Sequence, residues 1–209
     1  MSLSPPFLQI AGLHFSHGPI PVFQDFQATL PPGLSLVCGD EGRGKTTLLR
    51  LLAGELKPDA GSLRLGLLDP LQDAAAWQAE VCWLDPRNER FDRERPADCF
   101  AWVAKRHPRF DRSRLDALLE GLGLVPHLDK ALYMLSTGTR RKVWLAAALA
   151  SQARLVLLDE PFAALDRSSI RCLETELAEL AQAPDRAGLI ADYGAPPSLP
   201  LAAVLDLGD

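Results

Sequence analysis

The stretch Gly39-Asp40-Glu41-Gly42-Arg43-Gly44-Lys45-Thr46 has the G-x-x-x-x-G-K-[ST] spacing of a loop that binds phosphate groups. Its glycines let the backbone curl so that successive N–H groups point inward. The apolar run 34–38 precedes it, which predicts a buried strand, and leucines at helical spacing follow it. A chance match on a surface loop is the alternative, but this strand-loop-helix context favours a phosphate site whose helix N-terminus attracts anions.

Each polar residue of this loop has an expected partner. Lys45 is expected to contact the β- and γ-phosphates of a nucleoside triphosphate, and the Thr46 hydroxyl to be a ligand of Mg²⁺. Thr47 can reach the α-phosphate. We therefore predict that residues 39–47 hold ATP together with Mg²⁺.

A second motif, Asp159-Glu160, follows the apolar run 155–158. Ligands of doubly wound sheets bind at the carboxyl ends of the strands, so these acids are well placed to meet the phosphates. Mg²⁺ keeps several waters and few carboxylates, so Asp159 is expected to hold it through water. Glu160 is then expected to polarise the attacking water as the catalytic base. Strands often end in acids, and it is the upstream loop that makes this pair informative.

A third motif, Leu135-Ser136-Thr137-Gly138-Thr139, stands before that strand. With it, the chain resembles the ATP-binding cassette (ABC) ATPases over nearly its whole length. The segment is similar to that family's signature, Leu-Ser-Gly-Gly-Gln, and departs from it at Thr137 and Thr139. The resemblance implies that Ser136 and Gly138 face the γ-phosphate held by the opposite subunit of a dimer. A plain helix N-cap at Ser136 or Thr137 is the alternative.

Two further contacts rest on the same resemblance. Asp166 matches the aspartate that contacts the partner subunit, in the segment 161–166 that follows Glu160. His17 lies where the family carries an aromatic residue that stacks on adenine. Phe15 could stack instead after a register shift, and His17 is equally well explained as a surface histidine.

The chain departs from the family pattern after the strand 81–84. The family has a glutamine there that senses Mg²⁺ and the membrane partner, whereas this chain continues with Asp85-Pro86-Arg87. Asp85 could take a water-mediated role at Mg²⁺, and Pro86 stiffens the hinge.

The second departure is at Asp192-Tyr193, which follows the strand 189–191 where the family has a histidine that contacts the γ-phosphate. An ionised Asp192 can only accept hydrogen bonds. If the carboxylate lay about 4 Å from a phosphate oxygen, the two negative charges would repel each other by about 4 kcal/mol at an effective dielectric constant near 20. Such a repulsion corresponds to a loss of roughly a thousandfold in rate or affinity. Asp192 could instead point away, be protonated or pair with an arginine such as Arg186, and Tyr193 could supply a donor.

These motifs predict an α/β fold, a P-loop NTPase of the ABC type. We expect a mixed or parallel central sheet, an N-terminal antiparallel β-subdomain and a helical insertion. The chain of 209 residues is long enough for one such domain. Residues 1–86 and 150–209 are expected to form the nucleotide-binding core and residues 87–149 the helical and signature subdomain. Further helices are expected at 143–149 and 170–183, and closing strands at 187–191 and 202–207.

Composition restricts the partners. The net charge of −5 argues against a nucleic-acid-binding protein. No apolar run is long enough to span a bilayer and no signal peptide is evident, and the four scattered cysteines are expected to be reduced packing thiols. We therefore expect a cytoplasmic protein that reaches the inner face of a membrane through a separate transmembrane permease subunit. The resemblance implies a homodimer or a heterodimer with another ABC ATPase.

Two functions follow as alternatives. The first is the ATP-binding, ATP-hydrolysing subunit of an ABC transporter that powers a separate membrane subunit. The second is a regulatory or assembly cassette with little or no hydrolysis, which Asp192 and the missing glutamine favour.

Four aromatic residues lie where the family receives a helix of the membrane subunit, and they fit either a docking groove or the subdomain core: Trp83, Phe91, Phe100 and Trp102.

Overall fold

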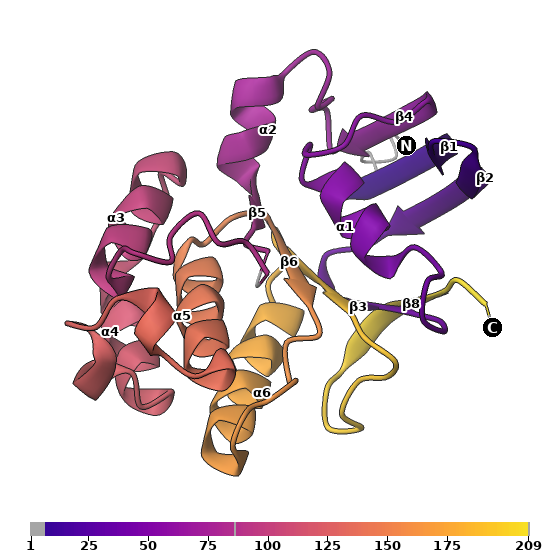
Figure 1. Cartoon of the computed structure of the whole chain (residues 1–209). Coiled ribbons are helices and arrows are strands. Elements are labelled where there is room, and N and C mark those ends of the chain that lie inside the picture. The colour runs from indigo at the N-terminus through magenta and orange to yellow at the C-terminus, as the bar shows by residue number, and fades with distance from the viewer. Residues whose placement is uncertain (1–6, 86, 209) are drawn as a thin grey trace.

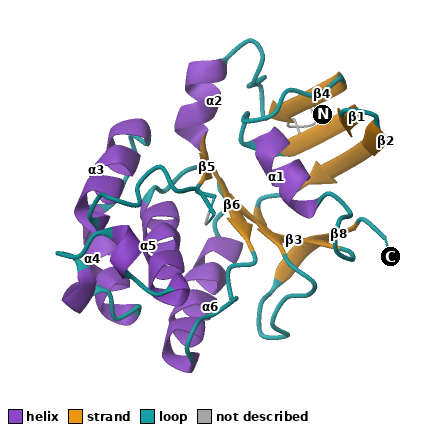
Figure 2. Cartoon of the chain, in the orientation of Figure 1, coloured by secondary structure: helices purple, strands orange, loops and turns teal. Residues whose placement is uncertain are grey.

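The computed structural model describes residues 7–85 and 87–208. Two sheets form its frame (Figures 1 and 2). One is antiparallel, in the order β2-β1-β4, and the other is a five-stranded sheet in the order β5-β6-β7-β3-β8, whose neighbours all pair in parallel. The strands are β1 Leu8–His17, β2 Ile20–Leu30, β3 Gly33–Cys38, β4 Ala60–Leu65, β5 Val81–Trp83, β6 Leu155–Asp159, β7 Ala187–Ala191 and β8 Leu201–Asp206.

Helices cover the parallel sheet on both faces. The α-helices are α1 Lys45–Leu52, α2 Ala74–Glu80, α3 Pro96–Arg106, α4 Arg112–Gly121, α5 Thr137–Ala150 and α6 Arg167–Ala181, and two short 3₁₀ turns cover Val125–His127 and Leu132–Met134. Figure 1 shows α3, α4, α5 and α6 gathered on one side of the molecule, while α1 lies on the other side with β1, β2 and β4.

The strands of the parallel sheet divide their side chains between two hydrophobic cores. In β6, Val156 and Leu158 pack into the core shared with α3 to α6, whereas Leu155 and Leu157 pack into the core shared with α1 and the antiparallel sheet. Successive side chains of a strand point to opposite faces, so a run that is apolar throughout must be buried on both. All five residues of β6 are buried, as a central parallel strand requires.

The expected fold agrees with this arrangement, including the parallel alternative for the central sheet, and two details differ. Helix α6 begins at Arg167 and ends at Ala181 rather than spanning 170–183. Helix α2 was not expected from its sequence, because it is rich in alanine and has one strong apolar residue. That residue, Trp77, is 1% exposed, and its indole N–H donates to the Leu52 carbonyl at 2.8 Å, which fixes α2 to the end of α1.

The parallel sheet brings four segments to one edge. Because β3, β5, β6 and β7 run in the same direction, their carboxyl ends meet there. The residues that follow these ends are the loop 39–44, the segment 84–87, Glu160 and the pair Asp192-Tyr193. This is the edge at which parallel α/β sheets bind ligands. Among the residues described, no helix has the length and apolar character needed to cross a membrane.

Candidate functional site

The loop between β3 and α1 has the backbone geometry that its glycines predict. Gly39, Gly42 and Gly44 have φ values of 139°, 80° and 93°, which side-chain-bearing residues rarely adopt. A Cβ atom on Gly44 would lie 2.6 Å from Val22 Cγ1, so only glycine fits beneath the start of α1. Glu41 and Arg43 are exposed, and the Asp40 carbonyl accepts the Arg43 backbone N–H at 3.4 Å.

Lys45, the first residue of α1, lies folded back over this loop. The residue is 9% exposed, and Nζ donates to the carbonyls of Gly39 at 2.5 Å and Asp40 at 2.9 Å. These carbonyls satisfy the ammonium group in place of phosphate oxygens. The ammonium group therefore lies beside the loop whose N–H groups are expected to surround the phosphates, and its contact with phosphate remains a prediction.

Thr46 and Asp159, the two expected magnesium ligands, come together across the site. The Thr46 hydroxyl donates to Asp159 Oδ2 at 2.8 Å although the residues are far apart in sequence. Burial raises the pKa of the Asp159 carboxyl, while the Thr46 hydrogen bond and the Arg87 guanidinium act in the opposite direction. One hydroxyl and one carboxylate fit Mg²⁺, which prefers oxygen ligands and keeps several waters.

The remaining ligands of such a metal would come from phosphate and water. In the part of the chain that the structure describes, no three His, Cys, Asp or Glu side chains are grouped as metal ligands.

Glu160, the expected catalytic base, has a strained backbone. Its φ is 45°, in the left-handed region, and its N–H donates to the Ala191 carbonyl at 2.8 Å. A guanidinium from α5 holds its other side: Arg141 Nη1 donates to the Glu160 carbonyl and, at 3.3 Å, to that of Asp159. The surrounding structure thus maintains an unfavourable conformation, as is common at catalytic positions.

Asp192 turns its carboxylate to its own backbone. Oδ1 accepts the Tyr193 N–H at 2.8 Å. Burial raises the pKa of the Asp192 carboxyl, and Glu160 raises it further, whereas the Tyr193 N–H, Lys45 and Arg141 lower it. Of the alternatives left open by the sequence, an ion pair with Arg186 is wrong, because that guanidinium donates to Ala153 O at 3.1 Å and to Gln152 Oε1.

The segment after β5 places an arginine where the family has its glutamine. Arg87 Nη2 lies 3.4 Å from Asp159 Oδ2. Asp85, considered above as a magnesium contact, instead accepts the Arg87 backbone N–H through Oδ1 at 2.9 Å. Pro86 lies outside the described residues.

His17, at the end of β1, lies beside the first turn of α1. Its Nε2 is 3.2 Å from the Thr47 hydroxyl, and its ring is exposed. Phe15 is 7% exposed and packs in the core, with its ring edge-on to His17 at 4.9 Å. Of the two, His17 alone offers a ring face near the loop, and the adenine contact remains a prediction.

The signature segment lies at the start of α5. Ser136 is the N-cap of that helix, and its Oγ accepts the Thr139 N–H at 3.1 Å. Gly138 packs against the chain after Glu160, since a Cβ atom there would lie 2.3 Å from the Ala164 carbonyl oxygen. Both residues thus have local structural roles, and the contact with a second subunit's phosphate remains a prediction.

Asp166 has local partners as well. It caps α6 by accepting the Ser169 N–H at 2.9 Å and lies 2.5 Å from Lys142 Nζ. The Lys142 side chain and the hydroxyl of Ser168 hold the pKa of the Asp166 carboxyl well below its usual range.

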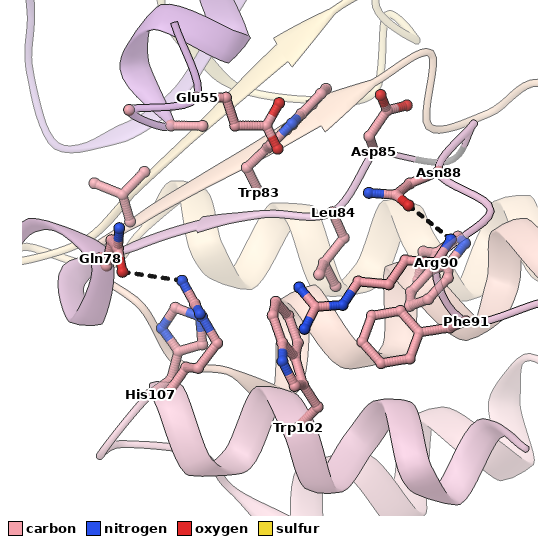
Figure 3. A pocket seen from close by; sticks show the side chains of 15 residues that line it. Glu55, Gln78, Trp83, Leu84, Asp85, Asn88, Arg90, Phe91, Trp102 and His107 are labelled. Atoms are coloured by element: carbon pink, nitrogen blue, oxygen red, sulfur yellow. Dashed lines mark hydrogen bonds between the residues drawn. The ribbon is translucent and has the colours of Figure 1, made fainter. Parts of the chain in front are cut away.

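Beside the site, the aromatic residues form a groove of about 200 Å³ between the sheet and α3. Trp83, Phe91 and Trp102 line it, whereas Phe100 is 5% exposed and belongs to the core. Figure 3 shows the Arg90 guanidinium between the rings of Phe91 and Trp102, at 5.4 and 5.2 Å from their centroids. Phe100 thus belongs to the subdomain core, Trp83, Phe91 and Trp102 line a groove, and the docking of a membrane subunit there remains a prediction.

Three features of the site were not predicted from the sequence. They are the Arg87 contact with Asp159, the Arg141 contact with Glu160, and the Tyr193 ring under the Lys45 ammonium group at 4.5 Å. Arginines occur at many exposed positions, so residue type and spacing alone do not separate Arg87 and Arg141 from the other arginines. Only the direct succession of Arg87 after Asp85-Pro86, at the end of a strand, gave a local signal.

Comparison with known proteins agrees with this geometry. The profile of the ABC transporter family matches residues 23–163, more than half of the chain. The chain is 34% identical over 176 residues to the cytochrome c biogenesis ATP-binding export protein CcmA of Pseudomonas savastanoi pv. phaseolicola, with 84% of this chain and 83% of that protein covered. It is 36% identical over 154 residues to the Fe(3+) ions import ATP-binding protein FbpC of Pseudomonas fluorescens, covering 69% of this chain and 43% of that protein.

Solved structures show the same fold at lower identity. The ATP-binding subunit of an ABC transporter superimposes with a TM-score of 0.81 at 19% identity, covering 90% of this chain and 79% of the other. CbiO1 of Clostridium perfringens, part of the ABC transporter complex cbiONQ, gives a TM-score of 0.67 at 20% identity, with 91% and 79% covered. The expected fold class is thereby confirmed. The chain belongs to the ABC transporter family and is one of its ATP-binding subunits.

Proposed function

We propose that this subunit binds MgATP at the edge described above and hydrolyses it to drive a separate transmembrane permease. One observation carries the proposal: Lys45, the Thr46–Asp159 pair and Glu160 meet at the carboxyl ends of β3 and β6. Together they offer a cation for the phosphates, oxygen ligands for Mg²⁺ and a carboxylate for water, the parts that phosphoryl transfer requires.

The two groups of relatives support the general role and not a particular cargo. CcmA is named as an export protein for cytochrome c biogenesis and FbpC as an import protein for Fe(3+) ions, and both are named as ATP-binding proteins. Their names share ATP binding and transport, but differ in its direction and cargo. We accordingly place this chain at the cytoplasmic face of a membrane, held there by its permease.

The groove beside α3 supports a permease contact. Its aromatic residues and the stacked Arg90 provide apolar area with a fixed cation, features that anchor protein interfaces. We propose that a helix of the permease binds there. Trp83 and Asp85 line the groove, and Arg87 follows two residues after Asp85, so the proposed permease contact and the proposed metal site share one segment of chain.

Hydrolysis would require a dimer. Ser136 and Gly138 lie on α5, which packs with α3, α4 and α6 away from α1 (Figure 1). No hydrogen bond joins Ser136 to residues 39–46 in the described part of the chain. We propose that these residues complete a site on a second ABC ATPase, either another copy of this chain or a related subunit.

Phosphate release from MgATP tests the proposal on the purified protein. We expect wild-type protein to release phosphate at high protein concentration, and Glu160→Gln to bind MgATP, form a stable dimer on a sizing column and release none. Glu120→Gln removes the same charge from an exposed position of α4 and should behave as wild type. ATP-dependent wild-type dimers without phosphate release would instead identify a regulatory cassette.

A further inference from the structure

The guanidinium of Arg87 lies beside the carboxylate that is expected to hold the metal. Arg87 Nη2 lies 3.4 Å from Asp159 Oδ2, the same oxygen that accepts the Thr46 hydroxyl. The Asp159 side chain is 2% exposed, whereas that of Arg87 is 62% exposed. The carboxylate is therefore fixed in the protein interior, and its cationic partner can leave for solvent without disturbing the core.

A buried carboxylate requires a charge partner. Moving an ion out of water is costly unless a counter-charge or hydrogen bonds compensate, and Asp159 has one hydroxyl donor and one guanidinium. Mg²⁺ held by Thr46 and, through water, by Asp159 would supply a larger charge beside the same carboxylate. Two cations at one carboxylate repel each other, so the arrival of the metal would displace Arg87.

The segment that carries Arg87 is also tied to the signature helix. Directly after it, the Asn88 carbonyl accepts Arg140 Nη2 at 2.6 Å, and the same nitrogen lies 2.5 Å from Asp92 Oδ1. Arg140 belongs to α5, three residues after the start of that helix. A movement of Arg87 would therefore shift the neighbouring residues, which line the groove and contact α5.

We propose that Arg87 is a positioning residue that neutralises Asp159 in the metal-free protein and is exchanged for Mg²⁺ when the nucleotide binds. The inference rests on the proposed function of this edge as a MgATP site. It makes Arg87 a competitor of the metal, so the wild-type protein needs more Mg²⁺ to reach half-saturation than a protein without this guanidinium.

A magnesium titration tests the exchange. A fluorescent ATP analogue is held at a fixed concentration with the full-length protein, and free Mg²⁺ is varied while binding is followed by anisotropy. An ion pair with one exposed partner corresponds to about a 2- to 5-fold change in an equilibrium constant. Arg87→Gln should lower the magnesium half-point by that factor. Arg87→Lys keeps the charge and should lie between the two.

A matched control separates this effect from a general change of charge. Arg93→Gln removes one positive charge from an exposed position in the same segment and should keep the wild-type half-point. Without Mg²⁺, Arg87→Gln should unfold at a lower temperature than wild type, because it leaves the buried Asp159 carboxylate without its guanidinium, whereas Arg93→Gln should unfold as wild type does.

The outcomes distinguish a failure of the exchange from a failure of the proposed function. An Arg87→Gln half-point equal to or above that of wild type would overturn the exchange, while magnesium-dependent binding by all proteins would leave the proposed function intact. If Mg²⁺ did not strengthen nucleotide binding by the wild-type protein at all, the metal site itself would be wrong and the exchange would fall with it.

Discussion

The Lys45 ammonium group lies 4.5 Å from the centroid of the Tyr193 ring while it donates to the carbonyls of Gly39 and Asp40. Tyr193 follows Asp192, at the position where the family has its phosphate-contacting histidine. The tyrosine is 61% exposed and the lysine 9% exposed. The Tyr193 ring and the two carbonyls thus hold the Lys45 ammonium group on its own loop.

This relationship predicts that removal of the ring strengthens nucleotide binding. An exposed cation–π contact is worth about 0.5–1 kcal/mol, so Tyr193→Ala should tighten MgATP binding by about 2- to 5-fold on that scale. Tyr193→Phe keeps the ring and should match wild type. Isothermal titration calorimetry measures both, and weaker binding by either variant would show that Tyr193 contacts the nucleotide instead.

The charge of Asp192 predicts a pH dependence. Burial raises the pKa of this carboxyl, so as pH falls through that pKa the group becomes neutral and its repulsion of the γ-phosphate is lost. Wild-type affinity for MgATP should therefore increase as pH decreases, more than that of Asp192→Asn, whose amide does not titrate. The ratio of the two affinities, measured from the ordinary pKa of an aspartate, about 4, up to about pH 8, isolates Asp192 from the titration of ATP itself. A ratio that does not vary with pH would place the carboxylate away from the phosphate.

Arg141 is predicted to act through Glu160. Its guanidinium holds the Glu160 carbonyl on a backbone with φ of 45°, so Arg141→Gln should let the carboxylate shift. Displacement of a catalytic group by about 1 Å can cost up to about 100-fold in rate. We expect a lower kcat with KM nearly unchanged in a phosphate-release assay. Arg171→Gln, at an exposed position of α6, is the control, and a change confined to KM would argue against this role.

Gly138 is predicted to contribute to the free energy of unfolding of the single subunit, independently of any dimer. A Cβ atom there would lie 2.3 Å from the Ala164 carbonyl oxygen, which is backbone and cannot turn aside. Overpacking of this kind costs about 1–3 kcal/mol, which urea denaturation of Gly138→Ala should show. A Cβ atom on Gly194 would meet no heavy atom within 4 Å, so Gly194→Ala should be nearly neutral. Equal midpoints for the two variants would mean that the signature helix adjusts freely.

Much of the fold could be predicted because its strands are apolar throughout and its glycines follow a known spacing. The run 155–158 is typical of a strand buried on both faces, and the glycine spacing of the loop 39–46 is typical of a turn that can enclose an anion. Helix α2 could not be predicted, because its packing depends on one residue, Trp77, and on a carbonyl of another helix. Long-range contacts of this kind are not encoded in local spacing.

The same limit applies to the site. Lys45, Thr46, Asp159 and Glu160 each belong to a short motif with a known mechanism, and the parallel strands bring them to one edge. Arg87 and Arg141 reach that edge from other elements, through flexible side chains whose endpoints depend on the tertiary structure. The substitutions at the glutamine and histidine positions could be recognised from the sequence, but the side chains that now fill those places could not.

The most direct test of the central claim is the affinity for MgATP of Lys45→Ala compared with Lys57→Ala, an equal change of charge outside the loop, measured by calorimetry on folded proteins. The account predicts that Lys45→Ala loses at least about tenfold in affinity, the equivalent of about 1.4 kcal/mol, while Lys57→Ala binds as wild type does. Equal affinities for the two variants would contradict it.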